Sequence, residues 1–357
     1  MSVTKKGWDQ NLMASVFKKE ATYNAGVTIT ATEGCSFLAY EFESGIDDVV
    51  TNDKSEVTGK EHGYTQEITQ YKCSPIIKFP KVTPNALAAF AGLVLGSVTS
   101  TKDGAVTAYK HKIVRVADGT ALPSIAIVHK IGGIQTQYKG LKGNTLKLFG
   151  EEGGGVSMEC GLMGSGTRAT DAQSFAAAIS ESWIKNANGT VWLETGANIS
   201  IDATLTQAAE NISSATPDDI KARVKSFEFN WDNALEAQFG FGGTDLVLLD
   251  AHYGRRKADL KVTARFYDST EIGYFTSQAV CAFEMDWKGS IIASGGTMYF
   301  GAQLIIPRCF LKKNPQPKGG VDDTLTQEFE FDIYDDGTNA PAILEVYNAQ
   351  AAYMVAP

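Results

Sequence analysis

The residue types that come nearest to a metal site lie in the acidic stretch Asp332-Ile333-Tyr334-Asp335-Asp336-Gly337, which resembles half of a calcium-binding loop. A calcium loop also needs a bidentate Glu at a fixed distance, and this stretch lacks one. A turn built on the Asp-Gly pair is the better interpretation. The histidines are scattered, and none pairs with a cysteine or carboxylate at ligand spacing: His62, His111, His129 and His252. We therefore predict no metal site and no catalytic residue.

Glycine-rich loops can bind phosphate, and closely spaced cysteines can support redox or zinc chemistry. The glycines between Gly153 and Gly166 do not follow a strand in G-x-G-x-x-G order leading into a helix, so we predict no nucleotide or other cofactor. The five cysteines are far apart and never form C-x-x-C: Cys35, Cys73, Cys160, Cys281 and Cys309. This usage favours reduced, mostly buried thiols in a protein that folds in the cytoplasm.

The densest basic run is Gly254-Arg255-Arg256-Lys257, with Tyr253 as its one aromatic neighbour. Nucleic-acid binding is one interpretation, and an electrostatic contact with an acidic neighbouring subunit is the favoured one. The chain has 32 Lys and Arg against 41 Asp and Glu, a formal charge of −9. This balance disfavours a protein that grips nucleic acid, but it permits one past which nucleic acid slides.

Most of the 357 residues have the alternation and turn spacing of β-strands, and no segment approaches the roughly 20 apolar residues that span a bilayer. Thr145–Phe149 and Val156–Leu162 predict a hairpin around the turn 151–155. Thr83, Pro84 and Gly96 predict a helix over 84–95 with one face on a sheet. A short helix is expected over 269–275. The other expected strands are 27–31, 35–42, 64–79, 105–116, 124–130, 134–138, 191–203, 224–231, 235–241, 257–266, 279–287, 297–306 and 325–334.

Two halves of similar length show this strand pattern. Strand-to-helix junctions at 77–90 and 264–275 give a weak internal repeat. We expect an N-terminal arm (1–26), a first β domain (27–166), a linker (167–189) and a second β domain (190–357). The chain is predicted to be a soluble all-β protein with short helices.

Several segments resemble the tail tube (major tail) proteins of long-tailed, non-contractile bacteriophages. Glu20-Ala21-Thr22-Tyr23 resembles the opening E-x-x-Y-G-T phrase of that family, although Asn24 replaces the usual Gly. The resemblance rests on the order and spacing of short phrases over most of the chain: 55–59, 83–96, 138–146, 153–166, 224–229, 303–311 and 319–331.

The resemblance implies two tandem tail-tube-like β-barrel or β-sandwich domains, each with a flanking helix. It also implies a non-enzymatic virion protein that forms trimeric pseudo-hexameric rings, or hexameric rings, stacked into a tube. Genomic DNA would pass through the lumen without specific binding, and the tape measure protein and tail terminator or tip proteins would be partners. The tube would belong to the virion tail and assemble in the host cytoplasm, without a membrane. Ile46–Gly63 and Asn314–Asp323 are candidate ring-to-ring contacts, or ordinary surface loops.

Another class of function fits the same composition. The chain could be a carbohydrate- or receptor-binding β-sandwich module, with sugar-stacking platforms supplied by tryptophans, although packing is the favoured role for most of them: Trp8, Trp183, Trp192, Trp231 and Trp287. A hydrolase would need paired carboxylates or a nucleophile with its base, and no motif nominates them.

Overall fold

The computed structural model of the chain describes residues 14–29, 35–37, 41–53, 65–131, 134–170, 181–195, 200–201, 207, 211–213, 218–239, 247–320 and 324–353. Trp8, His62, most of the expected loop 46–63 and residues 171–180 of the expected linker lie outside these ranges. Within them the protein is all-β with two short helices, as the sequence predicts.

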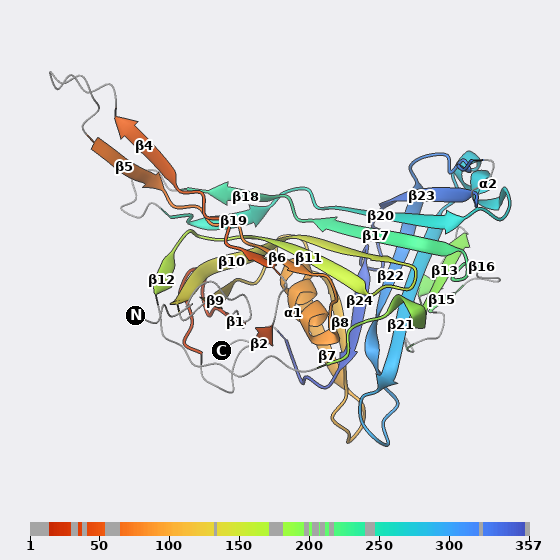
Figure 1. The fold of residues 1–357 in the computed structure, drawn as a ribbon, viewed down its shortest axis with the longest axis horizontal. Helices are drawn as coiled ribbons and strands as arrows, with labels where there is room; N and C mark the ends of the chain where they lie inside the picture. Colours follow the sequence, from red (N-terminus) through yellow and green to blue (C-terminus); the bar gives the residue numbers. More distant parts are fainter. Residues whose placement is uncertain are drawn as a thin grey trace, which may run out of the picture.

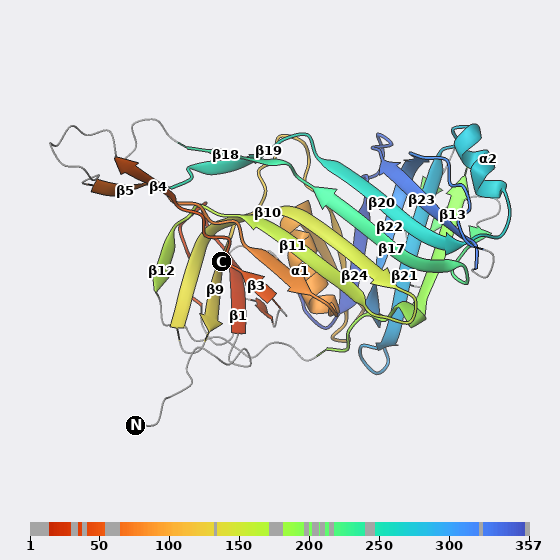
Figure 2. The same ribbon diagram turned by 45° about the horizontal axis from the view of Figure 1, so that its top comes forward.

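The strands are antiparallel and most of them form one continuous, barrel-like network of hydrogen bonds. Its main row runs in the order β3 (Glu41–Glu43), β6 (Ile76–Phe79), β11 (Val156–Met163), β10 (Ile134–Glu151), β17 (Val224–Asp232), β20 (Lys257–Arg265), β23 (Thr326–Ile333) and β22 (Tyr299–Leu311). Figure 2 shows β11, β10, β17 and β20 side by side in this row.

Further strands branch from β22 at one end of this row and from β10 within it. From β22 one branch continues through β21 (Cys281–Ile291) to β13 (Gly189–Thr195) and β16 (Asp218–Asp219), and another through β24 (Ile343–Asn348) to β8 (Tyr109–Arg115) and β7 (Gly96–Lys102). The first part of β10 pairs with β12 (Arg168–Thr170) and with β9 (Ile125–Ile131), which leads to β1 (Ala14–Lys19) and β2 (Cys35–Phe37).

Three two-stranded sheets complete the strand list: β4 (Val49–Asp53) with β5 (Thr65–Gln70), β14 (Ser200–Ile201) with β15 (Ile212–Ser213), and β18 (Leu235–Gln238) with β19 (Asp250–Tyr253). The β4–β5 hairpin projects from one end of the molecule, and helix α2 (Thr270–Thr276) lies at the opposite end (Figures 1 and 2). A short 3₁₀ turn, η2, covers Asn186–Asn188.

Helix α1 (Pro84–Leu95) begins and ends where the sequence predicts. The Thr83 side chain accepts a hydrogen bond from the amide of Ala86, and Gly96 ends the helix with φ of 92°. All its residues are buried, so the expectation of a single buried face is wrong. The segment carries no charged residue, and a helix that is apolar all round needs cover on every side. Strands β7, β8, β10, β22 and β24 supply that cover in the middle of the molecule (Figure 1).

Strands from the two halves of the sequence pair directly with each other. β10 pairs with β17 from Thr145–Asp232 to Glu151–Ser226, and β8 pairs with β24 from Tyr109–Asn348 to Val114–Ile343. One large cluster of buried apolar side chains extends through both halves. The division into two domains with a linker stays a prediction.

Most expected strands are present, with some corrections. Val27–Ile29 is not a strand. Its backbone carbonyls accept hydrogen bonds from side chains instead of from another strand: Gln137 Nε2 donates to Val27 O at 2.7 Å, and Lys18 Nζ to Thr28 O at 3.4 Å. The expected strand 64–79 is interrupted at 71–75, where Cys73 forms only isolated bridges, to Ile46 and Gly164. Residues 105–108 form a turn before β8. Eight strands lie outside those that the sequence predicts: β1, β4, β7, β12, β15, β16, β19 and β24. Of these, β4 lies within the expected loop 46–63 and β12 within the expected linker 167–189.

Candidate functional site

The open face of the main sheet row carries charges that alternate in sign from strand to strand. We call this set the charged stripe: Glu41 and Glu43 on β3, Lys78 on β6, Glu159 on β11, Lys147 on β10, Glu228 on β17, Lys261 on β20, Glu328 and Glu330 on β23, and Lys313 beyond β22. The stripe arises from the period-two alternation of each strand, because Phe227, Phe229 and Trp231 of β17 point into the core while Glu228 lies on the other face.

Ion pairs connect the stripe across the strands. Lys78 Nζ lies 3.0 Å from Glu41 Oε2 and 2.9 Å from Glu43 Oε1. Lys147 Nζ lies 2.9 Å from Glu228 Oε2, and Lys261 Nζ lies 3.1 Å from Glu328 Oε2. At the far end Lys313 Nζ lies 2.6 Å from Glu330 Oε1. Each of these lysines is therefore already matched by at least one carboxylate of the same sheet.

These pairs keep both partners ionised. Hydrogen bonding to Glu328 raises the pKa of Lys261, and hydrogen bonding from Lys313 lowers the pKa of Glu330. Burial would raise the pKa of Glu228, but hydrogen bonds from Lys147 and Asn230 and the charges of Lys147 and Lys261 lower it overall. The stripe therefore stays a set of matched charges around neutral pH.

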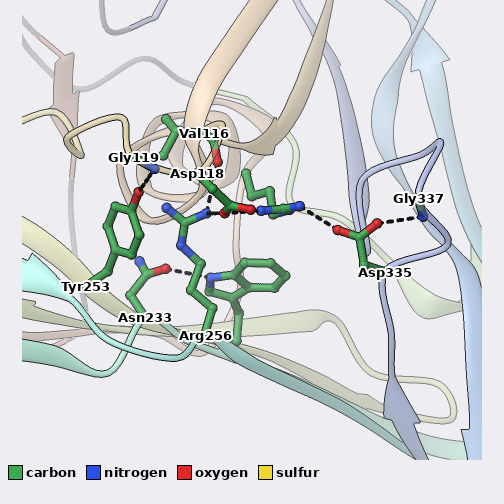
Figure 3. Close-up of polar contacts among 10 residues, drawn as sticks. Val116, Asp118, Gly119, Asn233, Tyr253, Arg256, Asp335 and Gly337 are labelled. Atoms are coloured by element: carbon green, nitrogen blue, oxygen red, sulfur yellow. Dashed lines mark hydrogen bonds and ion pairs between the residues drawn. The ribbon is translucent and has the colours of Figure 1, made fainter.

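A second polar cluster lies where the turn after β8 meets the start of β20 (Figure 3). Arg256 Nη1 donates to Val116 O at 2.9 Å, and its guanidinium lies 3.8 Å from the centre of the Tyr253 ring. The Tyr253 hydroxyl accepts a hydrogen bond from the Gly119 amide at 2.7 Å. Arg115 forms two ion pairs: its Nη1 lies 2.5 Å from Asp118 Oδ1, and its Nη2 lies 2.5 Å from Asp335 Oδ2. We call this cluster the arginine junction.

A groove of about 700 Å³ opens beside the arginine junction. Both sequence motifs singled out for chemistry line it, the basic run through Arg255, Arg256 and Lys257 and the acidic stretch through Asp332 and Asp335. The acidic stretch is a turn, as expected: Gly337 has φ of 81°, and its amide donates to Asp335 Oδ1 at 2.8 Å. Among the described residues, no group of three or more His, Cys, Asp or Glu could hold a metal ion.

Asn233 lies beside the arginine junction and joins core elements there; its backbone carbonyl accepts a hydrogen bond from the Gly254 amide at 3.2 Å. It is 1% exposed, and its Nδ2 donates to Val94 O at 2.7 Å and to Gly143 O at 2.9 Å. Its Oδ1 accepts from Trp231 Nε1 at 3.0 Å. One amide thus joins the end of α1 to strand β10 and to β17.

Comparison with known proteins gives one family. A family model described as phage tail tube protein matches residues 77–333. The chain belongs to the phage tail tube protein family. The match includes α1, the main sheet row except β3 and the first residue of β6, and the arginine junction except Asp335. No curated protein matches the chain. A structural protein of the virion tail is the function that this family supports.

The histidines of this tail tube protein take structural or exposed positions wherever they are described. His129 is buried with Nδ1 2.8 Å from Ser15 Oγ, and burial lowers its pKa to about 4. His111 Nδ1 lies 2.8 Å from Ser100 Oγ, and its Nε2 lies 3.1 Å from Asn348 Oδ1. Burial lowers the pKa of His111 as well. His252 is exposed beside Asp250.

Four of the cysteines and two of the tryptophans of the tail tube protein are buried in its core. Every cysteine is free, four are buried, and burial raises the pKa of all five thiols. Trp231 and Trp287 are 2% and 3% exposed, which leaves no face for a sugar ring. Trp183 is half-buried, and the ammonium groups of Lys81 and Lys185 lie 4.8 and 5.1 Å from the centre of its ring.

The sequence did not indicate the charged stripe, Asn233 or the role of Arg115. The alternation within single strands was visible, but the strand order that brings the charges together was not. The favoured interpretation of the basic run treats its members alike, whereas the structure separates them: Arg255 and Lys257 are exposed and Arg256 is held in the junction.

None of the described helices has both the length and the apolarity required to traverse a bilayer.

Proposed function

We propose that this tail tube protein is the ring-stacking subunit of the tube through which the phage genome is delivered, and that the charged stripe faces the lumen. The observation that carries the proposal is the ion pairing of the stripe. Duplex DNA binds proteins mainly through cations that replace the counterions of its phosphates. Lysines already matched by carboxylates offer DNA few such cations, so the surface lets DNA pass without specific binding.

The proposed ring is a homotrimer with six β-barrels around the lumen, one from each of two tandem tail-tube-like domains, or alternatively a hexamer. Among the described strands, β3 and β7 each have one neighbour within the chain, at opposite branches of the network. Such edges can pair with another copy, and repeated pairing with rotation closes a ring. Such pairing would cover sheet edges that are open in the single chain.

The proposed ring-to-ring contacts are the segments 46–63 and 314–323. The described part of the first belongs to the projecting β4–β5 hairpin (Figure 1). Ile46, Val50 and Ile68 at this hairpin are 45%, 41% and 39% exposed. Apolar side chains on a projecting hairpin are suited to burial against another copy.

Further partners of the proposed tube are the tape measure protein and the tail terminator or tip proteins. The tube would form in the host cytoplasm and become part of a long, flexible, non-contractile tail. These proposals rest on the family, whose members are tail tube proteins.

Electron microscopy of the purified full chain tests assembly. We expect hollow rings or tubes whose symmetry, three-fold or six-fold, can be counted directly. A monodisperse monomer at every concentration and salt condition would contradict the proposal.

The role of the stripe is tested by Glu228→Gln, which removes the carboxylate between Lys147 and Lys261. Glu236→Gln is the matched control, because it makes the same charge change on the exposed strand β18. We expect tubes of the E228Q variant to retain duplex DNA at low salt and to release it as salt rises, while E236Q and unmodified tubes retain little. Equal retention by E228Q and E236Q would refute a lumenal role for the stripe.

A further inference from the structure

We propose that the β4–β5 hairpin of one copy docks on a surface of a second copy formed by Lys81, Trp183, Lys185 and the groove beside them. We call these three residues the lysine–tryptophan patch. The inference rests on the proposed stacking of rings and adds to it the surface that receives the hairpin.

Backbone hydrogen bonds hold the patch in place beside the start of β11. The Val82 amide donates to Val156 O at 2.9 Å, and the Ile184 amide donates to Val82 O at 3.0 Å. The Trp183 ring packs on Gly155, where a Cβ would lie 2.7 Å from the ring. Both segments that carry the patch are therefore fixed to the same strand.

Lys81 and Lys185 are exposed cations without an opposite charge beside them. Their Nζ atoms lie 4.8 and 5.1 Å from the centre of the Trp183 ring, which is a cation–π arrangement. Within the part of the chain that the structure describes, neither lysine forms an ion pair with a carboxylate. The lysines of the charged stripe, by contrast, each have a carboxylate partner.

A groove of about 560 Å³ adjoins the patch, because Asn186, the residue after Lys185, belongs to its lining. Lys225 is exposed on its rim and also has no carboxylate partner among the described residues. Ala187 and Ala222 line the groove and are exposed. The surface thus combines three accessible lysines with apolar side chains.

The β4–β5 hairpin has the charge that this surface requires. In the sequence, the segment 46–70 has more acidic than basic residues: Asp47, Asp48, Asp53, Glu56, Glu61 and Glu67 against Lys54 and Lys60. Charges of opposite sign on two surfaces favour their encounter and fix their register.

The hairpin also presents apolar side chains. Val50 and Ile68 are register partners on β4 and β5, and they are 41% and 39% exposed. Residues directly opposite each other on antiparallel strands have their side chains on the same face, so these two form one apolar surface. It complements the apolar lining of the groove.

The hairpin and the patch lie at opposite ends of the molecule. The hairpin projects from one end, whereas β13, which begins shortly after Lys185, lies toward the end that carries α2 (Figures 1 and 2). A contact between them therefore joins two copies through different surfaces and can repeat in one direction. Stacking of rings requires such a contact.

The rim of the groove favours an acidic protein segment over duplex DNA. Exposed Glu151 and Glu152 line the groove, and Lys221 is already paired with Asp219 at 2.8 Å. A duplex lays a continuous run of phosphates on a surface and would meet these glutamates. A short hairpin can place its carboxylates at the unmatched lysines alone.

The first test is zero-length carbodiimide cross-linking of tubes assembled from an equal mixture of ¹⁴N- and ¹⁵N-labelled full chain. The reagent joins a lysine amine to a carboxylate in contact with it. We expect mixed-isotope cross-links from Lys81, Lys185 or Lys225 to an acidic residue of the segment 46–70, and none in the dissociated protein. Tubes in which these lysines form no cross-link to that segment would overturn the inference and leave the proposed tube intact.

The second test reverses the charge of the patch with K81E/K185E. The matched control is R255E/K257E, which makes the same charge change at two other exposed residues. We expect K81E/K185E to raise the concentration needed for assembly by about tenfold or more relative to the control, because like charges then face each other. The melting temperatures of the two dissociated variants should be close. Equal assembly of the two variants would overturn the inference.

A charge exchange extends this test. The variant D47K/E56K/E61K, with a basic hairpin, should also assemble poorly. Combining it with K81E/K185E in one chain restores opposite charges between neighbouring copies and should recover assembly. A further loss of assembly in the combined variant would overturn the inference.

Two other outcomes are decisive. If K81E/K185E weakens binding of a short DNA duplex while assembly is unchanged, the patch binds nucleic acid and the inference is wrong. If the unmodified chain never assembles under any condition, the proposed function fails and the contact between copies fails with it.

Discussion

Replacing Asn233 with Ala should destabilise this protein more than almost any other single change of a polar side chain. The substitution leaves three buried groups without their partners: Val94 O, Gly143 O and Trp231 Nε1. A buried group that loses its partner costs about 1 kcal/mol or more, so three give about 3 kcal/mol. The small cavity left by the amide adds to this cost.

The matched control for this prediction is Asn230→Ala on the same strand. Asn230 Nδ2 donates to Glu228 at 3.1 Å and to Asp259 at 3.0 Å, but on the open face, where water can replace the lost bonds. We expect a loss of about 0.5 kcal/mol there. Equilibrium unfolding in urea, followed by tryptophan fluorescence, measures both free energies of unfolding. If the two variants lie within 1 kcal/mol of each other, the reasoning about Asn233 is wrong.

Three other perturbations follow from particular contacts. Gly143→Ala would place a Cβ 2.6 Å from the backbone of α1 and should cost at least about 2 kcal/mol in unfolding free energy, whereas Gly273→Ala, in open space on α2, should stabilise by about 0.5 kcal/mol. Burial lowers the pKa of His129 to about 4 in the folded protein, against about 6.5 in the unfolded chain. The unfolded chain therefore takes up the proton first as the pH falls. The free energy of unfolding should decrease between pH 6.5 and pH 4, by about 3 kcal/mol at most. His129→Gln should remove that part of the decline in urea titrations at each pH; a decline identical to that of the unmodified chain would refute it. Asp103→Asn should speed amide exchange at Thr297, whose amide donates to Asp103 Oδ2 at 2.6 Å across two hairpins, and unchanged exchange would refute the contact.

Local chemistry in the sequence predicted several elements well. Helix α1 was located by its Thr cap, first-turn Pro and terminal Gly, because capping depends on a few neighbouring residues. The hairpin of β10 and β11 was predicted for the same reason, and Gly150 pairs with Val156 across the turn. The basic run and the acidic turn both stand out as motifs in the sequence.

Features that depend on long-range pairing could not be read in the same way. Strand β24 (Ile343–Asn348) is buried on both faces and shows no alternation, so it lacked the pattern by which half-buried strands are recognised. The charged stripe requires the order of eight distant segments, and the single-strand alternation carries no information about neighbours. Asn233 looked like an ordinary turn residue, and only the approach of α1 and β10 makes its amide important.

The direction of the long strands has a mechanical consequence. In Figure 1, β10, β17 and β20 run roughly along the longest axis of the molecule, and their ladders join the first half of the chain to the second. A pull along this axis would have to break many ladder bonds at once by sliding strands past each other, whereas a sideways pull would open them one after another. The subunit should therefore resist stretching far better along this axis than across it.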